Sequence, residues 1–538
     1  MILLLPIGFL LAASIAIFTL DKLRPKFGTS WLIASMSSIV AWLIYFIMRL
    51  RLPTLLEILA WDQSELNLLG RFSLLLDYDS WPYVLALITI HLAVILTDAA
   101  RTRYDSTPLA WSASLAITAM GLLALQSGTS VMLMVSWVVV DMIELVYLLR
   151  LEDINRYIIR IIIAYSVRTT SVLMLILGTS IGWQASGQFD LIDIPQNAAF
   201  IFLLAAGLRL GVFPLNLPFL QEPNLRRGAG NLIRLAPAAS SLVLLARLPS
   251  DLIPPNLIGW VPLFQGMLAV AALYAAVRWL SAVDEMEGRP FWIIGWAALA
   301  TSSVLNGAPS ASLAWGIALL LPGSLLFLYY PRVQRMNFLL YFGLIGLIGA
   351  PFTPLASGWS GMIAAGFSFW TLLFILAHAF LILGYLNRIL QPGGEAGALE
   401  SWARLVYPLG LIIIIQAMVT LGLIGWPGSL TPGIWWLALL SMLLVVSVVV
   451  LVKKLDIQPP YIQLPASSPL TKILDWLLPR LEQIFRLEWL YRILWQTYNV
   501  LGSALRSFSA VLESQGGVLW TILLLALLIS FLTGGGTN

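Results

Sequence analysis

Long runs of apolar residues follow one another along the chain, and each ends at charged residues or at a cluster of Pro and Gly. A helix needs about 20 such residues to cross the hydrocarbon core of a bilayer. The pattern predicts an all-α polytopic membrane protein with about fourteen to sixteen transmembrane helices. Their expected positions are residues 1–20, 30–49, 80–99, 108–126, 129–149, 157–183, 196–213, 230–248, 258–281, 291–306, 308–330, 336–357, 362–388, 404–426, 433–452 and 517–533.

The composition narrows the class of protein further. Of the 538 residues, 60% are hydrophobic and 10% are charged, whereas globular proteins carry roughly 25% charged residues. The absence of cysteine excludes disulfides, thiolate metal sites and cysteine nucleophiles. His91 and His378 are far apart, and no phosphate-binding loop or catalytic triad is present. We therefore expect no metal, no cofactor, no nucleic-acid partner and no catalytic site in this chain.

Charged loops predict the orientation in the membrane. Placing alternate loops on alternate sides leaves only Arg49, Arg51, Arg71 and Arg247 on one face, while most other basic loop residues collect on the opposite face. The basic face is cytoplasmic by the positive-inside rule. We expect a multi-pass protein of the cell (inner) membrane with its N-terminus outside. The first run lacks a basic leader and a cleavage site, so it is interpreted as a retained helix.

The C-terminal part has a different pattern. Charged and apolar residues alternate at helical spacing over residues 465–512, which is typical of a helix lying along a membrane surface. We expect this lateral segment on the cytoplasmic side, with a kink at Pro479, before a last anchor helix. The 22 tryptophans are interpreted mainly as the belt that marks membrane interfaces.

Two apolar runs are interrupted by Gly and Pro, the first at Pro214 and the second at Pro351 and Pro354. The interruptions are about 140 residues apart, as expected for two inverted five-helix repeats that each contain a broken helix. The predicted organisation is N-terminal helices (1–106), a first repeat (107–250), a second repeat (251–390), additional helices (391–464), the lateral segment (465–512) and the anchor (513–538).

Five motifs in this order resemble those of a known family. They are Phe72–Asp77 before a helix, Ser186–Asp190, Arg209–Asn216 at the first break, Gly349–Ser360 at the second, and the lateral segment followed by an anchor. The chain resembles, as a divergent member, the antiporter-like membrane subunits of respiratory complex I (NADH:quinone oxidoreductase) and of Mrp-type sodium/proton antiporters. The resemblance extends over about residues 65 to 450.

The resemblance implies translocation of protons, or of another cation such as sodium, through two half-channels. A row of ionisable residues in the middle of the membrane links them: a glutamate on the fifth helix, a lysine on the broken seventh, and further lysines or histidines beyond. It also implies that other integral membrane subunits, and the lipid bilayer, are the partners. Any NADH:quinone oxidoreductase activity would belong to those other subunits.

Five charged residues are candidates for this ion pathway. Asp141 and Glu144 are three residues apart on the fifth helix and therefore share one face. Arg168 is on the sixth helix, Arg209 stands at the lysine position of the family motif, and Arg234 is on the eighth helix. Burial of each is expensive unless it is paired or hydrated.

Other interpretations of these charges remain open. The family glutamate follows a tryptophan, but Val138 follows Trp137 here, and both acids come later. Glu144 would be interfacial if it paired with Arg150. The three arginines would be structural if they formed fixed ion pairs or extended to the membrane surface. Since a guanidinium does not deprotonate in proteins, Arg209 cannot relay a proton as a lysine does.

The second repeat departs further from the family. Leu319 replaces a histidine, and Gly323 and Gly361 replace lysines. The charged stretch 284–289 is interpreted as a solvated loop, with Arg289 as a weaker candidate for the family's basic residue there. His378 is interpreted as a helix–helix hydrogen bond.

These departures leave three hypotheses. The chain is an ion-translocating subunit of a larger assembly, or a non-conducting scaffold of the same fold, or a solitary carrier of a small solute. The surviving charges of the first repeat favour the first hypothesis. The missing lysines of the second repeat, and the absence of charge between Arg289 and Arg332, favour the second.

Overall fold

The computed structural model contains two compact units, residues 1–474 and 475–538, each considered separately. It describes residues 2–534 except 25–28, 60–71, 101–106, 150–153, 187–189, 218–226, 331–335, 352, 392–400, 432, 455–475, 477–478 and 514–516. Among the described residues, 11 helices are long and apolar enough to cross a membrane. The predicted all-α polytopic fold is confirmed.

The helices follow the predicted apolar runs. The first eight are α1 (Leu4–Leu23), α2 (Ser30–Met48), α3 (Ser80–Asp98), α4 (Pro108–Leu125), α5 (Ser130–Leu148), α6 (Ile154–Ser186), α7 (Gln196–Leu210) and α8 (Arg227–Ala246). The next eight are α9 (Val261–Ser281), α10 (Glu285–Leu305), α11 (Ser312–Leu328), α12 (Phe338–Leu347), α13 (Ala356–Met362), α14 (Phe369–Leu390), α15 (Ser401–Ile424) and α16 (Trp435–Lys454).

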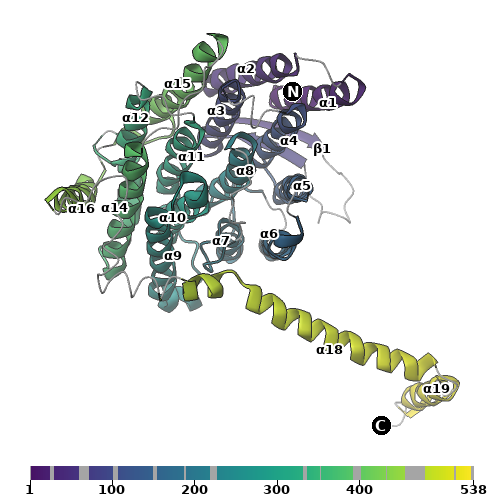
Figure 1. The fold of residues 1–538 in the computed structure, drawn as a ribbon. Helices are drawn as coiled ribbons and strands as arrows, with labels where there is room; N and C mark the ends of the chain where they lie inside the picture. The colour runs from purple at the N-terminus through teal and green to yellow at the C-terminus, as the bar shows by residue number, and fades with distance from the viewer. Residues whose placement is uncertain are drawn as a thin grey trace. The chain divides into compact units, whose positions relative to one another are not determined.

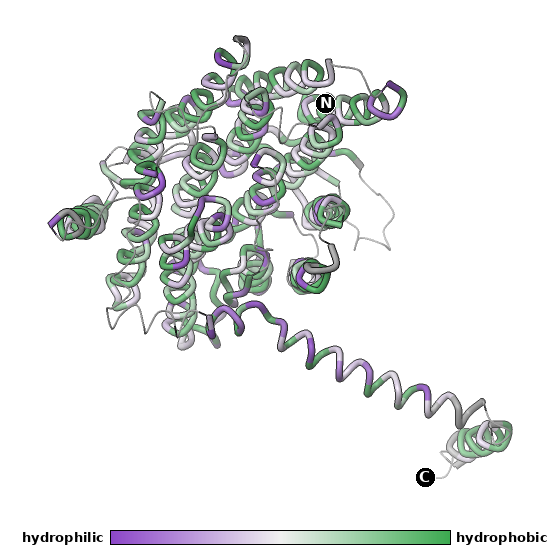
Figure 2. The backbone as a smooth tube through the Cα atoms, viewed as in Figure 1, coloured by the Kyte–Doolittle hydropathy of each residue, from purple (hydrophilic) through white to green (hydrophobic). Residues whose placement is uncertain are grey.

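The helices of the first unit form a central group and an outer group. Figure 1 shows α3, α8, α10 and α11 at the centre, with α1, α2, α15 and α16 outside them. Every residue in the membrane-length segments of α8 and α11 is buried inside the protein, whereas only 33% of the residues in that of α1 are buried. Hydrophobic residues predominate along these helices (Figure 2). A helix that is apolar all round fits a buried position, and the outward faces of the outer helices fit contact with lipid.

A short β-hairpin precedes α3 and was not predicted. Strands β1 (Thr54–Leu59) and β2 (Phe72–Leu76) pair antiparallel, with Thr54 opposite Leu76. The β2 end also bonds to the α4–α5 turn, where Leu75 N–H donates to the Gln126 carbonyl at 2.6 Å. The motif at 72–77 is therefore mostly strand, and it fixes where α3 and α5 begin.

Both predicted helix breaks are present. Helix α7 ends at Leu210, Gly211 adopts φ 78°, and the described residues up to 217 are not helical. In the second repeat, α12 ends at Leu347 and α13 starts at Ala356. A positive φ suits glycine because it has no Cβ. The boundaries of the two repeats stay a prediction.

The second unit contains α18 (Glu488–Glu513) and the anchor helix α19 (Gly517–Gly534). Figure 2 shows hydrophilic and hydrophobic residues alternating along α18, as the sequence predicts. Pro479 is helical and the described helix is interrupted at Leu487, with φ 56°; the kink at Pro479 stays a prediction, because residues 477–478 before it lie outside the described residues. The lateral segment up to residue 475 lies outside the described residues.

Candidate functional site: a buried row of alternating charges

Helix α5 presents one polar face to its neighbours. The side chain of Thr129 caps the helix by accepting from Met132 N–H. Trp137, Asp141 and Glu144 follow at spacings of four and three residues, so they share a face. All three are buried, and the carboxylate residues are only 4% and 3% exposed. This face points toward helices that each supply an arginine.

Asp141 is held by Arg209 in a two-point interaction. Arg209 Nη1 donates to Asp141 Oδ2 at 2.7 Å, and Nη2 donates to Oδ1 at 2.5 Å. The guanidinium also lies 4.6 Å from the ring centroid of Trp137, a cation–π distance. Arg209 is on the last turn of α7, where the helix dipole favours a positive charge. The break after α7 therefore fixes this pair in place.

Glu144 is held by the two remaining arginines. Arg234 Nη1 on α8 donates to Glu144 Oε1 at 2.8 Å, and Arg168 Nη1 on α6 donates to Glu144 Oε2. The same Arg168 nitrogen is 3.4 Å from Asp141 Oδ1. The five side chains form one row of alternating charge, in the order Arg209, Asp141, Arg168, Glu144 and Arg234, which we call the charge row.

Four consecutive helices, α5 to α8, meet at the charge row, and all five of its residues are buried. Three arginines face two carboxylates, which leaves one formal positive charge in excess. Isolated charges in such a place are expensive, but each carboxylate here has two cationic neighbours. Removing one member would leave the charge of its partners buried without a counter-ion, which destabilises the fold.

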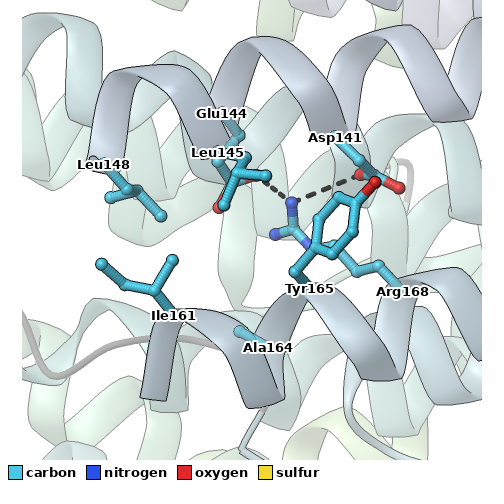
Figure 3. A pocket seen from close by; sticks show the side chains of 8 residues that line it. All are labelled: Asp141, Glu144, Leu145, Leu148, Ile161, Ala164, Tyr165 and Arg168. Carbon is cyan, nitrogen blue, oxygen red and sulfur yellow. Dashed lines mark hydrogen bonds and ion pairs between the residues drawn. The ribbon is translucent and has the colours of Figure 1, made fainter. Parts of the chain in front are cut away.

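A small groove opens beside the charge row, between α5 and α6. Figure 3 shows the Arg168 guanidinium pointing between Asp141 and Glu144, with Tyr165 beside it and Leu148 and Ile161 farther along. Its remaining lining residues are Leu145 and Ala164. The groove is charged at one end and apolar at the other, and its closed part has room for about one water molecule.

These contacts show whether the five charged residues are paired in the interior or lie at the membrane surface. Asp141 and Glu144 are interior and paired, as expected, and Glu144 is not merely interfacial. Arg168, Arg209 and Arg234 are buried in ion pairs, so the interpretation that they extend to the membrane surface is wrong. Arg150 lies outside the described residues. The role of the charge row in ion movement stays a prediction.

The interpretation of residues 284–289 as a solvated loop is wrong. Asp284 caps α10 by accepting from Glu287 N–H at 2.7 Å, and the following residues are helical. Glu285 is buried and pairs with Arg227 at the start of α8. Arg289 is fully buried in the same helix. Arg227 and Glu285 are 58 positions apart, so their pairing cannot be seen in the sequence.

His378 on α14 is confirmed as a helix–helix hydrogen bond. Its Nδ1 lies 2.7 Å from Ser441 Oγ on α16, and its Nε2 lies 3.1 Å from the Leu347 carbonyl at the end of α12. A carbonyl only accepts, so Nε2 carries the hydrogen and Nδ1 accepts from Ser441. Both ring nitrogens are therefore used in holding three helices together.

Comparison with known proteins defines the fold. No family model matches the sequence, and no curated protein does. A subunit of the Mrp complex from Dietzia sp. DQ12-45-1b superposes with a TM-score of 0.71 at 14% identity; the match covers 100% of this chain and 63% of that subunit. This chain shares its fold with that subunit.

A second solved structure agrees with this result. A chain of the membrane-bound sulfane sulfur reductase, an archaeal respiratory membrane complex, matches with a TM-score of 0.68 and 14% identity. The match covers 98% of this chain and 100% of that one. The resemblance inferred from the motifs is confirmed at the level of the fold.

Proposed function

We propose that this chain is an antiporter-like subunit of a multi-subunit membrane complex, in which it moves protons or another cation. The observation that carries the proposal is the charge row, closed by four helices beside a helix break and a groove. Both structural neighbours are parts of membrane complexes. An isolated helix bundle has no structural need for five buried charges, since apolar residues of similar volume serve stability at least as well.

The arginines and the carboxylates of the charge row have different roles. An arginine stays protonated, so Arg168, Arg209 and Arg234 set the local potential and do not release protons. Asp141 and Glu144 are the groups of the row that can bind and release a proton. When Glu144 binds one, its attraction for Arg168 falls, and the guanidinium moves toward Asp141, 3.4 Å away. Arg168 thereby links the two carboxylates.

Access to the charge row is through the groove in this proposal. Its lining reaches from Asp141 to Leu148, the last residue of α5. In this proposal that end of α5 lies on the cytoplasmic side of the cell membrane and the N-terminus lies outside, a topology that the positive-inside rule supports. Other integral membrane subunits are the partners, and any redox chemistry belongs to them.

The alternative is a non-conducting scaffold with the same fold. The arginine at the family's lysine position favours it, because a fixed salt bridge holds α5 and α7 together without any proton transfer. The loss of the family's lysines in the second repeat, which has no charged residue between Arg289 and Arg332, favours it too. In that case the charge row serves assembly alone.

Replacing both carboxylates separates the two functions. Asp141→Asn with Glu144→Gln should stop coupled ion movement in membrane vesicles, when uptake is compared at equal amounts of assembled complex. Proton uptake is measured by a pH-sensitive dye, and assembly by native gel and mass spectrometry of the purified complex. Unchanged uptake in an assembled double variant would refute translocation through the row, and a loss of assembly alone would favour the scaffold.

A further inference from the structure

Five tryptophans in the second repeat form a continuous stack through its interior. They come from α9, α10, α11 and α13 and are all 0% exposed. In spatial order they are Trp279, Trp292, Trp296, Trp315 and Trp359, which we call the tryptophan ladder. The ring centroids of consecutive members lie 5.1 to 6.0 Å apart. The interpretation of the tryptophans as mainly an interfacial belt does not hold for these five.

We propose that the tryptophan ladder closes the second repeat to water and ions, so that any ion path through this chain runs through the first repeat alone. The inference concerns a barrier and does not depend on whether the charge row conducts. It rests on how the rings are packed, on what fixes them, and on what packs against them.

Glycines on neighbouring helices make room for the rings. A Cβ placed on Gly358 would lie 2.7 Å from the Trp315 ring, and one on Gly349 would lie 2.7 Å from Trp359 Nε1. A Cβ on Gly323 would collide with Trp292 Nε1. The indoles therefore fill the space that any side chain at these positions would need, including position 323, where the family motif has a lysine.

Hydrogen bonds from the indoles to the backbone fix the orientation of two rings. Trp279 Nε1 donates to the Leu381 carbonyl at 3.0 Å, and Trp292 Nε1 donates to the Leu319 carbonyl at 2.9 Å. Arg388 closes the Trp279 end, with its guanidinium carbon 3.6 Å from the ring centroid. Its nitrogens donate to backbone carbonyls, including that of Trp279 at 2.6 Å. Arg388 is thus bound to backbone and ring at the end of the ladder.

His378 packs against the last three rings of the stack. Its ring meets those of Trp296, Trp315 and Trp359 edge-on at centroid distances of 5.5, 5.9 and 4.9 Å. Both of its nitrogens are already bonded to neighbouring helices. The imidazole therefore has no nitrogen left for a chain of water molecules, and protonation of Nδ1 would cost the bond that it accepts from Ser441.

The nearby polar residues also satisfy one another. Ser302 Oγ donates to Gln265 Oε1 at 2.7 Å, and Gln265 Nε2 donates to Asn306 Oδ1 at 2.7 Å. Asn306 Nδ2 then donates to the Met362 carbonyl at 2.6 Å, on the helix that carries Trp359. Neutral groups bonded in this way hold helices together and offer no group that changes charge.

Opening the ladder is the direct test. The full chain, in the complex with which it purifies, is reconstituted into liposomes containing a pH-sensitive dye, and the passive proton leak is followed after a potassium diffusion potential is applied. Trp315→Ala with Trp359→Ala should raise the leak several-fold, while Trp315→Phe with Trp359→Phe, which keeps the rings, should stay near the wild type. A folded Ala variant with wild-type leak would overturn the barrier.

A cysteine probe keeps the test valid if the double Ala variant does not fold. The chain has no cysteine of its own, so Ser303→Cys introduces one thiol, next to the Trp315 indole that donates to Ser303 Oγ at 2.9 Å. A maleimide reacts with the thiolate, which forms only where water reaches. Cys at 303 should react only after denaturation in SDS, whereas Ser507→Cys on exposed α18 should react at once. Equal rates in the folded protein would overturn the proposal.

Discussion

The two repeats have the same kind of broken helix but opposite interiors. The break after α7 places Arg209 against Asp141, and the interior around it contains a row of charges. The break after α12 is held by His378, and the interior around it contains stacked indoles. A helix break therefore does not by itself make an ion path. What differs is whether the neighbouring helices supply side chains that change charge or rings that exclude water.

The largest expected effect is on the charge row. Asp141→Asn removes the charge that Arg209 contacts at two points and should cost about 3–5 kcal/mol of folding free energy, because a buried cation loses its counter-ion. The thermal unfolding midpoint in detergent, followed by tryptophan fluorescence, measures it. Removing both charges, as Asp141→Asn with Arg209→Gln, should recover a large part of the loss. No recovery would show that the pair is not the source of the effect.

The next effect concerns the centre of the second repeat. His378→Ala leaves Ser441 and the Leu347 carbonyl without their buried hydrogen-bond partner. The substitution should lower the free energy of unfolding by about 2–4 kcal/mol. The same unfolding assay measures the loss, and ion uptake per assembled complex should stay at the wild-type level. A drop in uptake without loss of stability would make His378 part of an ion path, and the second repeat would then not be closed to ions.

A smaller effect tests the packing of the tryptophan ladder. Gly323→Ala pushes a methyl group into Trp292 and should destabilise by about 1–3 kcal/mol, as overpacking does in tight interiors. Gly8→Ala on α1 is the matched control, since nothing lies within 4 Å of its Cβ. That variant should have an unchanged or slightly raised stability, because alanine has a higher helix propensity than glycine. Equal unfolding midpoints for the two variants would argue against tight packing at Trp292.

The last effect depends on pH and lies just before α3, outside the spans. Asp77 pairs with Arg247, which follows α8, at 3.2 Å. Burial, together with the nearby Asp77 carboxylate, raises the pKa of Asp79 to about 6. The folded state therefore holds a proton on Asp79 that the unfolded chain releases near pH 4, and this stabilisation is lost as the pH rises from about 4 to 6.

Asp79→Asn should remove that dependence. Below pH 4 the variant and the wild type should unfold at similar temperatures. Between pH 4 and 6 the unfolding temperature of the variant should rise relative to that of the wild type. Above pH 6 the difference between the two unfolding temperatures should stay constant. Unfolding midpoints measured across pH 4 to 8 check this, and a difference that does not vary with pH would contradict the raised pKa.

Sequence patterns predicted the helices and the first-repeat charges well, for physical reasons. Length and hydropathy are enough to define a membrane helix, and a buried carboxylate at i, i+3 spacing needs a cation nearby. The pairing of Asp141 and Glu144 with arginines follows from that need. Which arginine pairs with which carboxylate does not follow, because Arg168 turns out to bridge both.

The features that sequence missed depend on contacts between distant segments. Trp292 is indistinguishable in sequence from an interfacial tryptophan until Gly323 on another helix leaves room for it. Glu285 looks solvated until Arg227 is placed beside it. The hairpin at 54–59 and 72–76 is short and apolar, so hydropathy alone cannot separate it from a helix end.

One comparison of two buried glutamates tests the central claim most directly. Glu144 lies in the charge row, whereas Glu285 pairs with Arg227 outside it. Coupled proton uptake is measured in vesicles containing equal amounts of assembled complex with either Glu144→Gln or Glu285→Gln. The account predicts a large loss of uptake for Glu144→Gln and near wild-type uptake for Glu285→Gln. Equal uptake in both variants would contradict translocation through the charge row.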